Sequence, residues 1–154
     1  MRRGILIAAM ALALVGCGDG EEQTPAACFA DADVYLAALE DAPGEVRLDS
    51  TTAISDCLVE EQDEGTLGSV GEPVIAAATE LNAEAREDPA GDATVQLGYL
   101  VGAVQEGAST TGGIHEDLVI RLDTAARFSE GGEPFPPEFE RAFGEGYAAG
   151  QASG

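Results

Sequence analysis

The sequence has no lysine and no tryptophan, and it contains a single histidine. All seven basic residues are arginines, against 29 acidic residues, so the formal net charge at pH 7 is −22. A surface with this charge repels phosphate backbones, which argues against binding to nucleic acid. It also repels anionic lipid head groups, so basic side chains cannot be what attaches the protein to a membrane.

Motifs of the common enzyme classes are absent as well. The chain carries no Gly-x-Ser-x-Gly elbow, no Walker loop, no glycine-rich dinucleotide loop and no His-Glu-x-x-His. His115 stands beside Glu116 and Asp117, but adjacent residues of a helix do not face each other, and we expect His115 to lie on the surface. A glycosidase-like pair of catalytic carboxylates is an open alternative. The acidic residues are so numerous, however, that the sequence does not indicate which two would form the pair. We therefore expect no enzyme, no catalytic residue, no metal and no cofactor.

The residues that are present begin with a targeting segment. Two arginines follow the first methionine, residues 5–15 are apolar without interruption, and a cysteine stands at position 17. A short basic region, an apolar stretch and a cleavage site of small residues are the parts of a secretory signal. The apolar stretch is too short for a transmembrane helix, which needs about 20 residues.

The residues Leu14-Val15-Gly16-Cys17 resemble the lipobox of bacterial lipoproteins. The resemblance covers residues 1–17 only. It implies that the Cys17 sulfur receives a diacylglycerol and that the bond before it is cut, and two or more acyl chains hold a protein stably on a membrane. We therefore predict a signal peptide at 1–16 and an extracytoplasmic protein that is anchored to the cell membrane through Cys17. In a cell with two membranes, the outer membrane is an alternative location. The alternative is an ordinary cleaved signal with an unmodified Cys17.

The residues after the predicted lipid form a polar segment. Residues 17–25 are expected to comprise the lipidated cysteine and a flexible tether, since Gly18 to Pro25 are small or polar. Eight extended residues reach about 26–29 Å. A tether of this length would hold the following domain clear of the lipid head groups.

Apolar residues recur at helical spacing through the rest of the chain, which predicts one all-α domain over residues 26–150. We expect a compact bundle of five or six helices. The first five cover residues 26–42, 52–64, 70–87, 93–108 and 114–128, and Pro136-Pro137 open a last one. For the most apolar stretch, residues 95–104, a buried strand is the competing interpretation. Residues 151–154 are expected to form a disordered tail.

Local signals set the predicted helix boundaries. Gly65 is expected to end the second helix. Ser69 and Glu72 have the spacing of a capping box, which would place Pro73 in the first turn of the third helix, where its missing N–H costs little. Asp92 is expected to cap the fourth helix.

Two glycines four residues apart, Gly98 and Gly102, lie in the most apolar helix. This spacing lets a second helix approach closely. We expect a neighbouring helix of the same domain to pack there, and a surface for self-association is the alternative. Phe139, Phe143 and Tyr147 share one face of the last helix, and we expect this face to dock it on the domain.

The cysteines predict one disulfide. With Cys17 lipidated, Cys28 and Cys57 are the only thiols left in an exported protein, where cysteines are expected to pair. We place them on the apolar faces of the first two helices, folded back as a hairpin. The chain-entropy model values such a bridge at about 3–4 kcal/mol. Two buried free cysteines are the alternative. A zinc site is disfavoured, because pairing of the cysteines leaves one histidine, and zinc needs more cysteine or histidine ligands than that.

These patterns predict a lipid-anchored interaction or binding module of the bacterial cell envelope, with an envelope protein as its possible partner. The alternative is a lipoprotein that binds a cation or a small ligand through acidic helix ends. Acids gather near the predicted C-termini of three helices, at residues 40–41, 60–64 and 84–88. Negative charge is unfavourable there, and converging carboxylates would suit a hard cation such as calcium.

Replacing the lipid acceptor tests the anchor. In a Cys17→Ser variant no thiol is available for lipid transfer, so we expect an unprocessed precursor or a protein released from the membrane. Lipid labelling of cells and detergent partitioning measure the two outcomes. Labelling and partitioning that match the unmodified protein would contradict the lipobox interpretation.

Overall fold

The computed structural model describes residues 23–127 and 134–154. Cys17, the predicted signal peptide and most of the predicted tether lie outside the described residues, so lipidation stays a prediction. Within the described ranges, no helix is long and apolar enough to cross a membrane.

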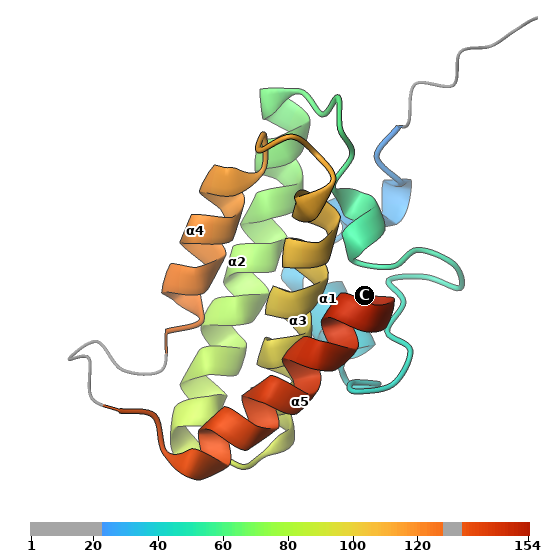
Figure 1. Cartoon of the computed structure of the whole chain (residues 1–154). Helices are drawn as coiled ribbons and strands as arrows, with labels where there is room; N and C mark the ends of the chain where they lie inside the picture. Colours follow the sequence, from blue (N-terminus) through green and yellow to red (C-terminus); the bar gives the residue numbers. More distant parts are fainter. Residues whose placement is uncertain (1–22, 128–133) are drawn as a thin grey trace, which may run out of the picture.

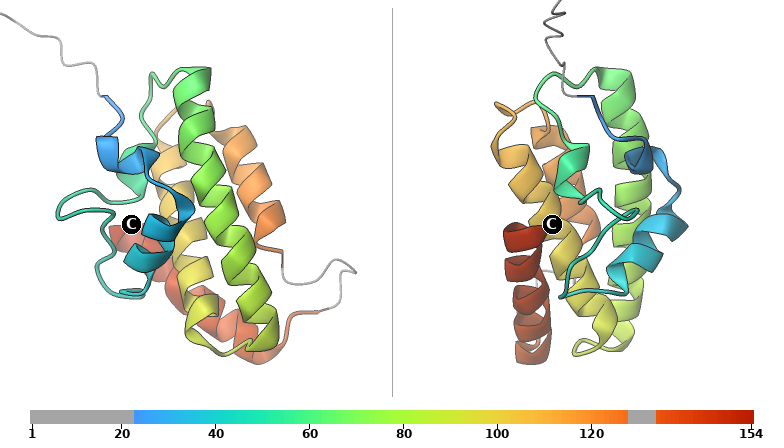
Figure 2. Two further views of the ribbon diagram at one scale, coloured as in Figure 1. Left: turned by 180° about the vertical axis from the view of Figure 1, so that it is seen from behind. Right: turned by 90° about the vertical axis from the view of Figure 1, so that its right-hand side faces the viewer.

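The described chain is all-α, as predicted, and it contains no strand. Figure 1 shows α2, α3 and α4 side by side, and the view from behind in Figure 2 shows α1 and the loop after it on the opposite face from α5. The elements are the 3₁₀ turn η1 (Ala26–Phe29), α1 (Ala32–Leu39), the 3₁₀ turn η2 (Ser55–Cys57), α2 (Glu64–Glu87), α3 (Asp92–Ser109), α4 (Glu116–Ala125) and α5 (Pro137–Ser153). The strand interpretation of residues 95–104 is wrong, because they form the middle of α3.

The hydrophobic core is centred on α3. This helix contacts α1, α2, α4, α5 and η2, and its residues 97–104 are all buried. A helix buried on nearly all sides belongs at the centre of a bundle. The loop between α1 and α2 also contributes to the core, because Val46 and Ile54 are fully buried. The core therefore includes irregular chain as well as helices.

The first predicted helix is interrupted. Ala30 and Asp31 have extended backbones, so η1 and α1 are separate and α1 ends at Leu39 instead of residue 42. The hydroxyl of Tyr35 donates to the carbonyl oxygen of Cys28 at 2.9 Å across this break. That buried bond satisfies a carbonyl that a continuous helix would have bonded internally.

The second predicted helix, residues 52–64, is wrong except for the short turn η2. The Asp49 carboxylate accepts hydrogen bonds from the backbone N–H groups of Thr51 and Thr52 at 2.8 and 2.7 Å, and Asp56 accepts from Ala53 at 2.9 Å. Such local side-chain bonds compete with helix formation. They hold this segment as a series of turns.

The helix α2 begins six residues earlier than predicted. Asp63 is its N-cap and accepts from the N–H groups of Gly65 and Thr66 at 3.0 and 3.1 Å. Gly65 therefore lies inside the helix and does not end one. The expected capping box is also wrong, since the Ser69 hydroxyl donates to the Gly65 carbonyl, and Pro73 lies in the helix interior.

The other helices differ from prediction mainly at their ends. Gly91 takes the N-cap position of α3 and Asp92 is its first residue, while α4 starts at Glu116 and ends at Ala125, inside the predicted range. The predicted tail at 151–154 is wrong, because α5 continues to Ser153 and Gly154 is buried. Arg47 donates to the Ser153 carbonyl at 3.0 Å. Packing on α3 keeps these last residues helical.

The two predicted packing glycines lie under a helix of the same domain, α5. A Cβ atom on Gly98 would stand 2.1 Å from the carbonyl oxygen of Phe143, and one on Gly102 would stand 2.3 Å from that of Tyr147. Real Cβ atoms do not approach backbone oxygens so closely, which makes glycine necessary at both positions. The prediction of packing within the domain is confirmed.

A second pair of glycines on α5 faces α3 in the same way. A Cβ on Gly146 would lie 1.8 Å from the carbonyl oxygen of Val95, and one on Gly150 would lie 2.2 Å from that of Tyr99. Both contacts advance along α3 as they advance along α5, so the two helices run in the same direction. Each helix therefore places its own backbone in the space left by the missing side chains of the other.

The aromatic face of α5 packs beside this contact, as predicted. Phe139 is buried, and Phe143 and Tyr147 are half-buried against the core. The rings of Phe139 and Phe143 stack at 5.6 Å, and those of Phe143 and Tyr147 at 6.3 Å. The Tyr147 hydroxyl also donates to Gln105 of α3 at 2.5 Å.

Two glycines of α5 allow a matched test of the contact with α3. Gly146→Ala adds a methyl group that meets the Val95 carbonyl, so we expect a loss of about 1–3 kcal/mol in the free energy of unfolding. Gly144→Ala, two residues away, meets no atom within 4 Å and should stabilise the helix by about 0.5–1 kcal/mol. Urea unfolding of both variants measures the difference, and equal stabilities would contradict the close approach.

Candidate binding groove

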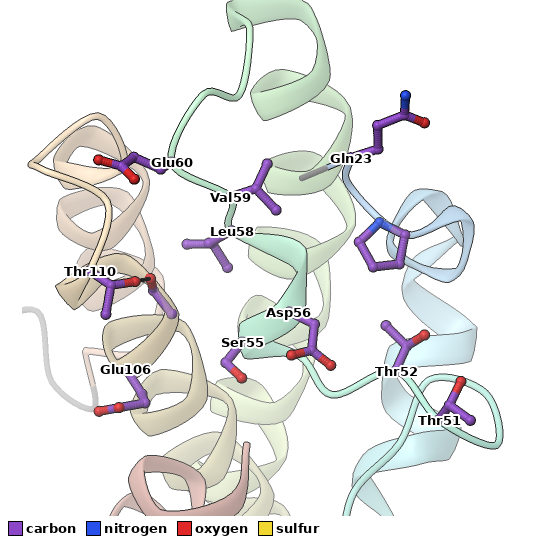
Figure 3. Close-up of a pocket in the computed structure, with 12 residues that line it drawn as sticks. Gln23, Thr51, Thr52, Ser55, Asp56, Leu58, Val59, Glu60, Glu106 and Thr110 are labelled. Atoms are coloured by element: carbon purple, nitrogen blue, oxygen red, sulfur yellow. Dashed lines mark hydrogen bonds between the residues drawn. The ribbon is translucent and has the colours of Figure 1, made fainter. Parts of the chain in front are cut away.

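A polar groove of about 660 Å³ lies where the first described residues, the loop around η2 and the end of α3 meet (Figure 3). It is open to solvent along one side. Hydroxyl and carboxylate groups dominate its lining, which consists of Gln23, Pro25, Thr51, Thr52, Ser55, Asp56, Leu58, Val59, Glu60, Glu106, Gly107 and Thr110. Among these residues only Glu60 belongs to a site that the sequence suggested, the acidic cluster at 60–64, because the lining comes from three segments without a shared motif.

The loop side of the groove is held in shape by its own turns. The hydrogen bonds from the backbone N–H groups of Thr51 and Thr52 lower the pKa of Asp49. This carboxylate therefore stays ionised and keeps accepting both bonds at neutral pH. Ser55 donates its hydroxyl to the backbone oxygen of Gly154, so the end of α5 supports the floor of the groove.

The helix side of the groove depends on a glycine of α3. A Cβ on Gly107 would lie 2.6 Å from the carbonyl oxygen of Ser55, so only glycine lets η2 come this close to α3. Glu106 and Thr110 stand on either side of Gly107 along the helix and line the groove. The sequence signal was present, since Gly107 continues the glycine-rich character of α3, but nothing in the sequence says which loop it receives.

Three carboxylates and four hydroxyl groups give the groove its chemistry. Asp56, Glu60 and Glu106 provide negative charge from two different sides, as Figure 3 shows. In the part of the chain that the structure describes, no three histidine, cysteine or acidic residues are placed to hold a metal ion. The arrangement suits a polar group that donates several hydrogen bonds, such as an amine or a hydroxyl-bearing ligand.

The predicted disulfide between Cys28 and Cys57 forms, and the residues on both sides of Cys57 in the sequence, Asp56 and Leu58, line the groove. The Cα atoms of the two cysteines are 5.4 Å apart, within the range that a disulfide requires. The expected helical hairpin is wrong, because Cys28 lies in η1 and Cys57 ends η2. The bridge thus joins two short turns that have few helical bonds of their own.

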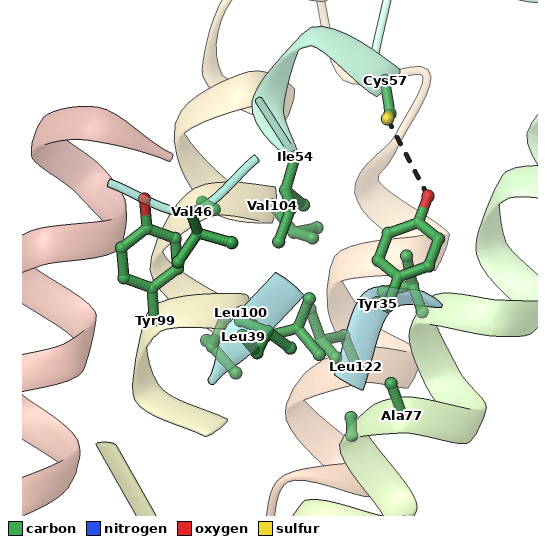
Figure 4. Packing of buried hydrophobic residues seen from close by; sticks show 14 of the residues in the cluster. Tyr35, Leu39, Val46, Ile54, Cys57, Ala77, Tyr99, Leu100, Val104 and Leu122 are labelled. Carbon is green, nitrogen blue, oxygen red and sulfur yellow. Dashed lines mark hydrogen bonds between the residues drawn. The ribbon is translucent and has the colours of Figure 1, made fainter. Parts of the chain in front are cut away.

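Tyr35 supports both ends of this disulfide from α1. Its hydroxyl donates to the carbonyl oxygen of Cys28 and lies 3.8 Å from the sulfur of Cys57 (Figure 4). The ring is fully buried, and desolvation raises the pKa of the phenol. The hydroxyl therefore remains a neutral donor at physiological pH.

His115 is buried, and its predicted place on the surface is wrong. Its Nδ1 lies 2.7 Å from the hydroxyl of Thr111 and its Nε2 lies 2.6 Å from Oε1 of Gln62. The turn at Gly112 and Gly113, both with positive φ, directs the histidine inward where a continuous helix would not. Because both ring nitrogens have partners inside the protein, His115 is not available as a base in the groove.

Gln62 connects His115 to the last residues of the predicted tether. Its amide nitrogen donates to the carbonyl oxygen of Cys57 at 3.0 Å and to the hydroxyl of Thr24 at 2.7 Å. The amide oxygen therefore accepts a hydrogen bond from Nε2–H of the histidine. This network fixes the first described residues to the end of α3 and the start of α4.

The acidic helix ends do not behave as the sequence suggested. Residues 60–63 lie in the loop before α2, Glu64 opens that helix, and Asp63 caps it, which is a favourable place for negative charge. Hydrogen bonds from Thr66, first from its hydroxyl, lower the pKa of Asp63. Of the three acidic groups that were expected at helix C-termini, the one at residues 60–64 therefore lies at the start of a helix instead.

No family model, no curated protein and no solved structure matches this chain.

The buried histidine makes stability depend on pH. Burial lowers the pKa of His115 in the folded protein below its ordinary value of 6.5. At a pH between this lowered pKa and 6.5, the unfolded chain binds a proton at His115 that the folded chain does not bind. The free energy of unfolding should therefore fall as the pH drops below 6.5 and stay level above it. Urea unfolding from about pH 8 to pH 5, above the carboxylate range, measures this slope. His115→Gln should remove most of the slope, and an unchanged slope would contradict the assignment.

Proposed function

We propose that this protein is a lipid-anchored binding module on the outer side of a bacterial cell membrane, that it is not an enzyme, and that the polar groove receives its partner. The buried Cys28–Cys57 disulfide is the observation that carries the location. Structural disulfides persist in oxidising compartments and are rare in the cytosol. The disulfide and the lipobox-like sequence before Cys17 are independent features that point to the same export.

The chemistry of the groove supports binding over catalysis. Ser55, the serine that lines it, is engaged with Gly154, and the only histidine of the chain is committed to Thr111 and Gln62. A serine nucleophile needs an adjacent base, which this arrangement does not supply. Carboxylates and hydroxyls around a partly open depression instead provide orientation and charge for a ligand that donates hydrogen bonds.

Apolar docking has less support than polar binding. The large apolar side chains that are exposed come from different elements: Phe29, Val34, Ile114, Ile120 and Phe135. Binding surfaces for protein partners usually present a contiguous apolar patch. The groove is therefore the better candidate, and its partner should carry basic or hydroxyl groups.

The position of the groove relative to the predicted anchor fits a partner near the membrane. Gln23 and Pro25 line the groove, and only five residues separate Gln23 from Cys17. A chain of that length spans at most about 20 Å when extended. A lipid on Cys17 would therefore keep the groove within reach of molecules at the membrane surface.

Site-specific photocrosslinking in intact cells tests this proposal. A photoreactive residue in place of Val59, inside the groove, should give a discrete adduct, whereas the same residue at Ile120 on α4 should not. The double variant Glu60→Gln, Glu106→Gln should reduce the Val59 adduct severalfold, because it removes charge and keeps side-chain size. Gel analysis with mass spectrometry identifies the adduct. Equal adducts from both positions, or an adduct that ignores the double variant, would overturn the groove as the binding site.

A further inference from the structure

His115 lies at the centre of a hydrogen-bond network that reaches all three segments of the polar groove. On one side its Nε2–H donates to Gln62, whose amide nitrogen donates to Thr24 and to the carbonyl oxygen of Cys57. On the other side its Nδ1 lies 2.7 Å from the hydroxyl of Thr111. Thr24 belongs to the first described residues, Cys57 to η2, and Thr111 follows the end of α3. Each of the three is next in sequence to residues that line the groove: Gln23, Pro25, Asp56, Leu58 and Thr110.

The amide of Gln62 has one orientation that satisfies this network. Its nitrogen is the atom that donates to Thr24 and Cys57, so its oxygen faces the ring and can only accept. Nε2 of His115 therefore carries a hydrogen in the neutral ring as well as in the charged ring. A change in protonation takes place at the other nitrogen, Nδ1, beside Thr111.

The hydroxyl of Thr111 can satisfy either state of Nδ1. It lies 2.7 Å from this ring nitrogen and 2.8 Å from the carbonyl oxygen of Ala108. When the ring is neutral, the hydroxyl donates its one hydrogen to Nδ1. When the ring is charged, Nδ1–H donates to the hydroxyl oxygen, and the hydroxyl donates to Ala108. That carbonyl also accepts from the backbone N–H of Thr111 at 3.2 Å, so it has a donor in both states.

His115 can therefore gain a proton without breaking the network. A buried N–H that found no acceptor would be costly, but each N–H of the charged ring has one here. The remaining cost is the transfer of a charge into the protein interior, which is the cause of the lowered pKa of His115. The change of charge thus belongs on the acid side of neutral pH.

The charged residues on the elements that hold the ring are acidic and exposed to solvent. They are Asp56, Glu106, Glu116, Asp117 and the four acids among residues 60–64. Within the described residues none of them forms an ion pair with His115. Three of them, Asp56, Glu60 and Glu106, line the groove. A positive charge on the neighbouring ring weakens the attraction of these carboxylates for a basic partner.

We propose that His115 makes the polar groove sensitive to pH, so that the groove holds a basic partner near neutral pH and releases it in acid. The proton enters at Nδ1, the Thr111 hydroxyl turns to Ala108, and the network carries the change to the three segments of the groove. Regulation of a partner rests on the proposed function of the groove, whereas the response of the network to pH does not. By linkage, a bound basic partner should oppose protonation of the ring by the same factor.

NMR spectra of the full chain in detergent micelles, with the disulfide intact, test the network without a partner. The His115 ring should carry hydrogen on Nε2 alone at neutral pH and on both nitrogens in acid, while the protein stays folded. The amides of Thr24, Leu58 and Thr110 should shift with the same midpoint as the ring, and the amide of Ala148 on α5 should not. His115→Gln should abolish these shifts.

Two variants of Thr111 show which way its hydroxyl bonds. Thr111→Val removes the acceptor of the charged ring as well as the donor of the neutral ring. Because hydrogen bonds to charged groups are the stronger ones, the pKa of His115 should fall. A hydroxyl that only donated to the neutral ring would give a raised pKa when removed. Thr111→Ser keeps the hydroxyl and should keep the pKa of the unmodified protein. A raised or unchanged pKa in Thr111→Val, or groove amides that do not follow the ring, would overturn the proposal.

The photoreactive residue at position 59 tests the effect on a partner. Its adduct should decrease severalfold at the pH where the spectra show a charged ring, and His115→Gln should keep the adduct there. A loss in acid that is the same with and without His115 would refute the regulation. An absent adduct at neutral pH would overturn the groove as a binding site and with it the regulation, even where the spectra show that the network responds.

Discussion

The contact between the backbones of α3 and α5 is the constraint on which the rest of the structure depends. Gly98 and Gly102 of one helix and Gly146 and Gly150 of the other remove the side chains that would keep the two apart. Their close packing carries α5 along α3 to its last residue, where Gly154 accepts a hydrogen bond from Ser55. Through Ser55 the helix pair also determines where η2 lies, and with it the floor of the polar groove.

The disulfide holds the first part of the domain in place, as helix packing holds the last part. The segment from 40 to 63 contains many turns and little helix, yet it places Val46 and Ile54 in the core. The Cys28–Cys57 bridge limits the freedom of this segment in the unfolded chain, since it closes a loop of 29 residues. Gln62 and His115 then fix the far side of the same segment through partly buried hydrogen bonds.

Sequence patterns predicted those features that depend on local periodicity. Apolar spacing predicted the helices from α2 onward, the predicted export of the chain suggested the disulfide, and small residues in an apolar helix indicated the packing role of Gly98. The turns at 49–56 were missed because aspartate bonds to nearby backbone outweigh an apolar pattern that resembles a helix. His115 and the groove were missed because their partners come from segments far apart in the sequence, and no spacing within one segment encodes such a meeting.

The parallel arrangement of α3 and α5 has a consequence for the order in which the domain folds. The two helices are separated in the chain by α4, so their contact is non-local, whereas α2 and α3 are joined by a short turn and can pair early. A chain that emerges with its N-terminus first exposes the glycine face of α3 until α5 has emerged as well. The polar groove is therefore incomplete until the last helix docks, and under the proposed export a chain still crossing the membrane could not engage a partner there.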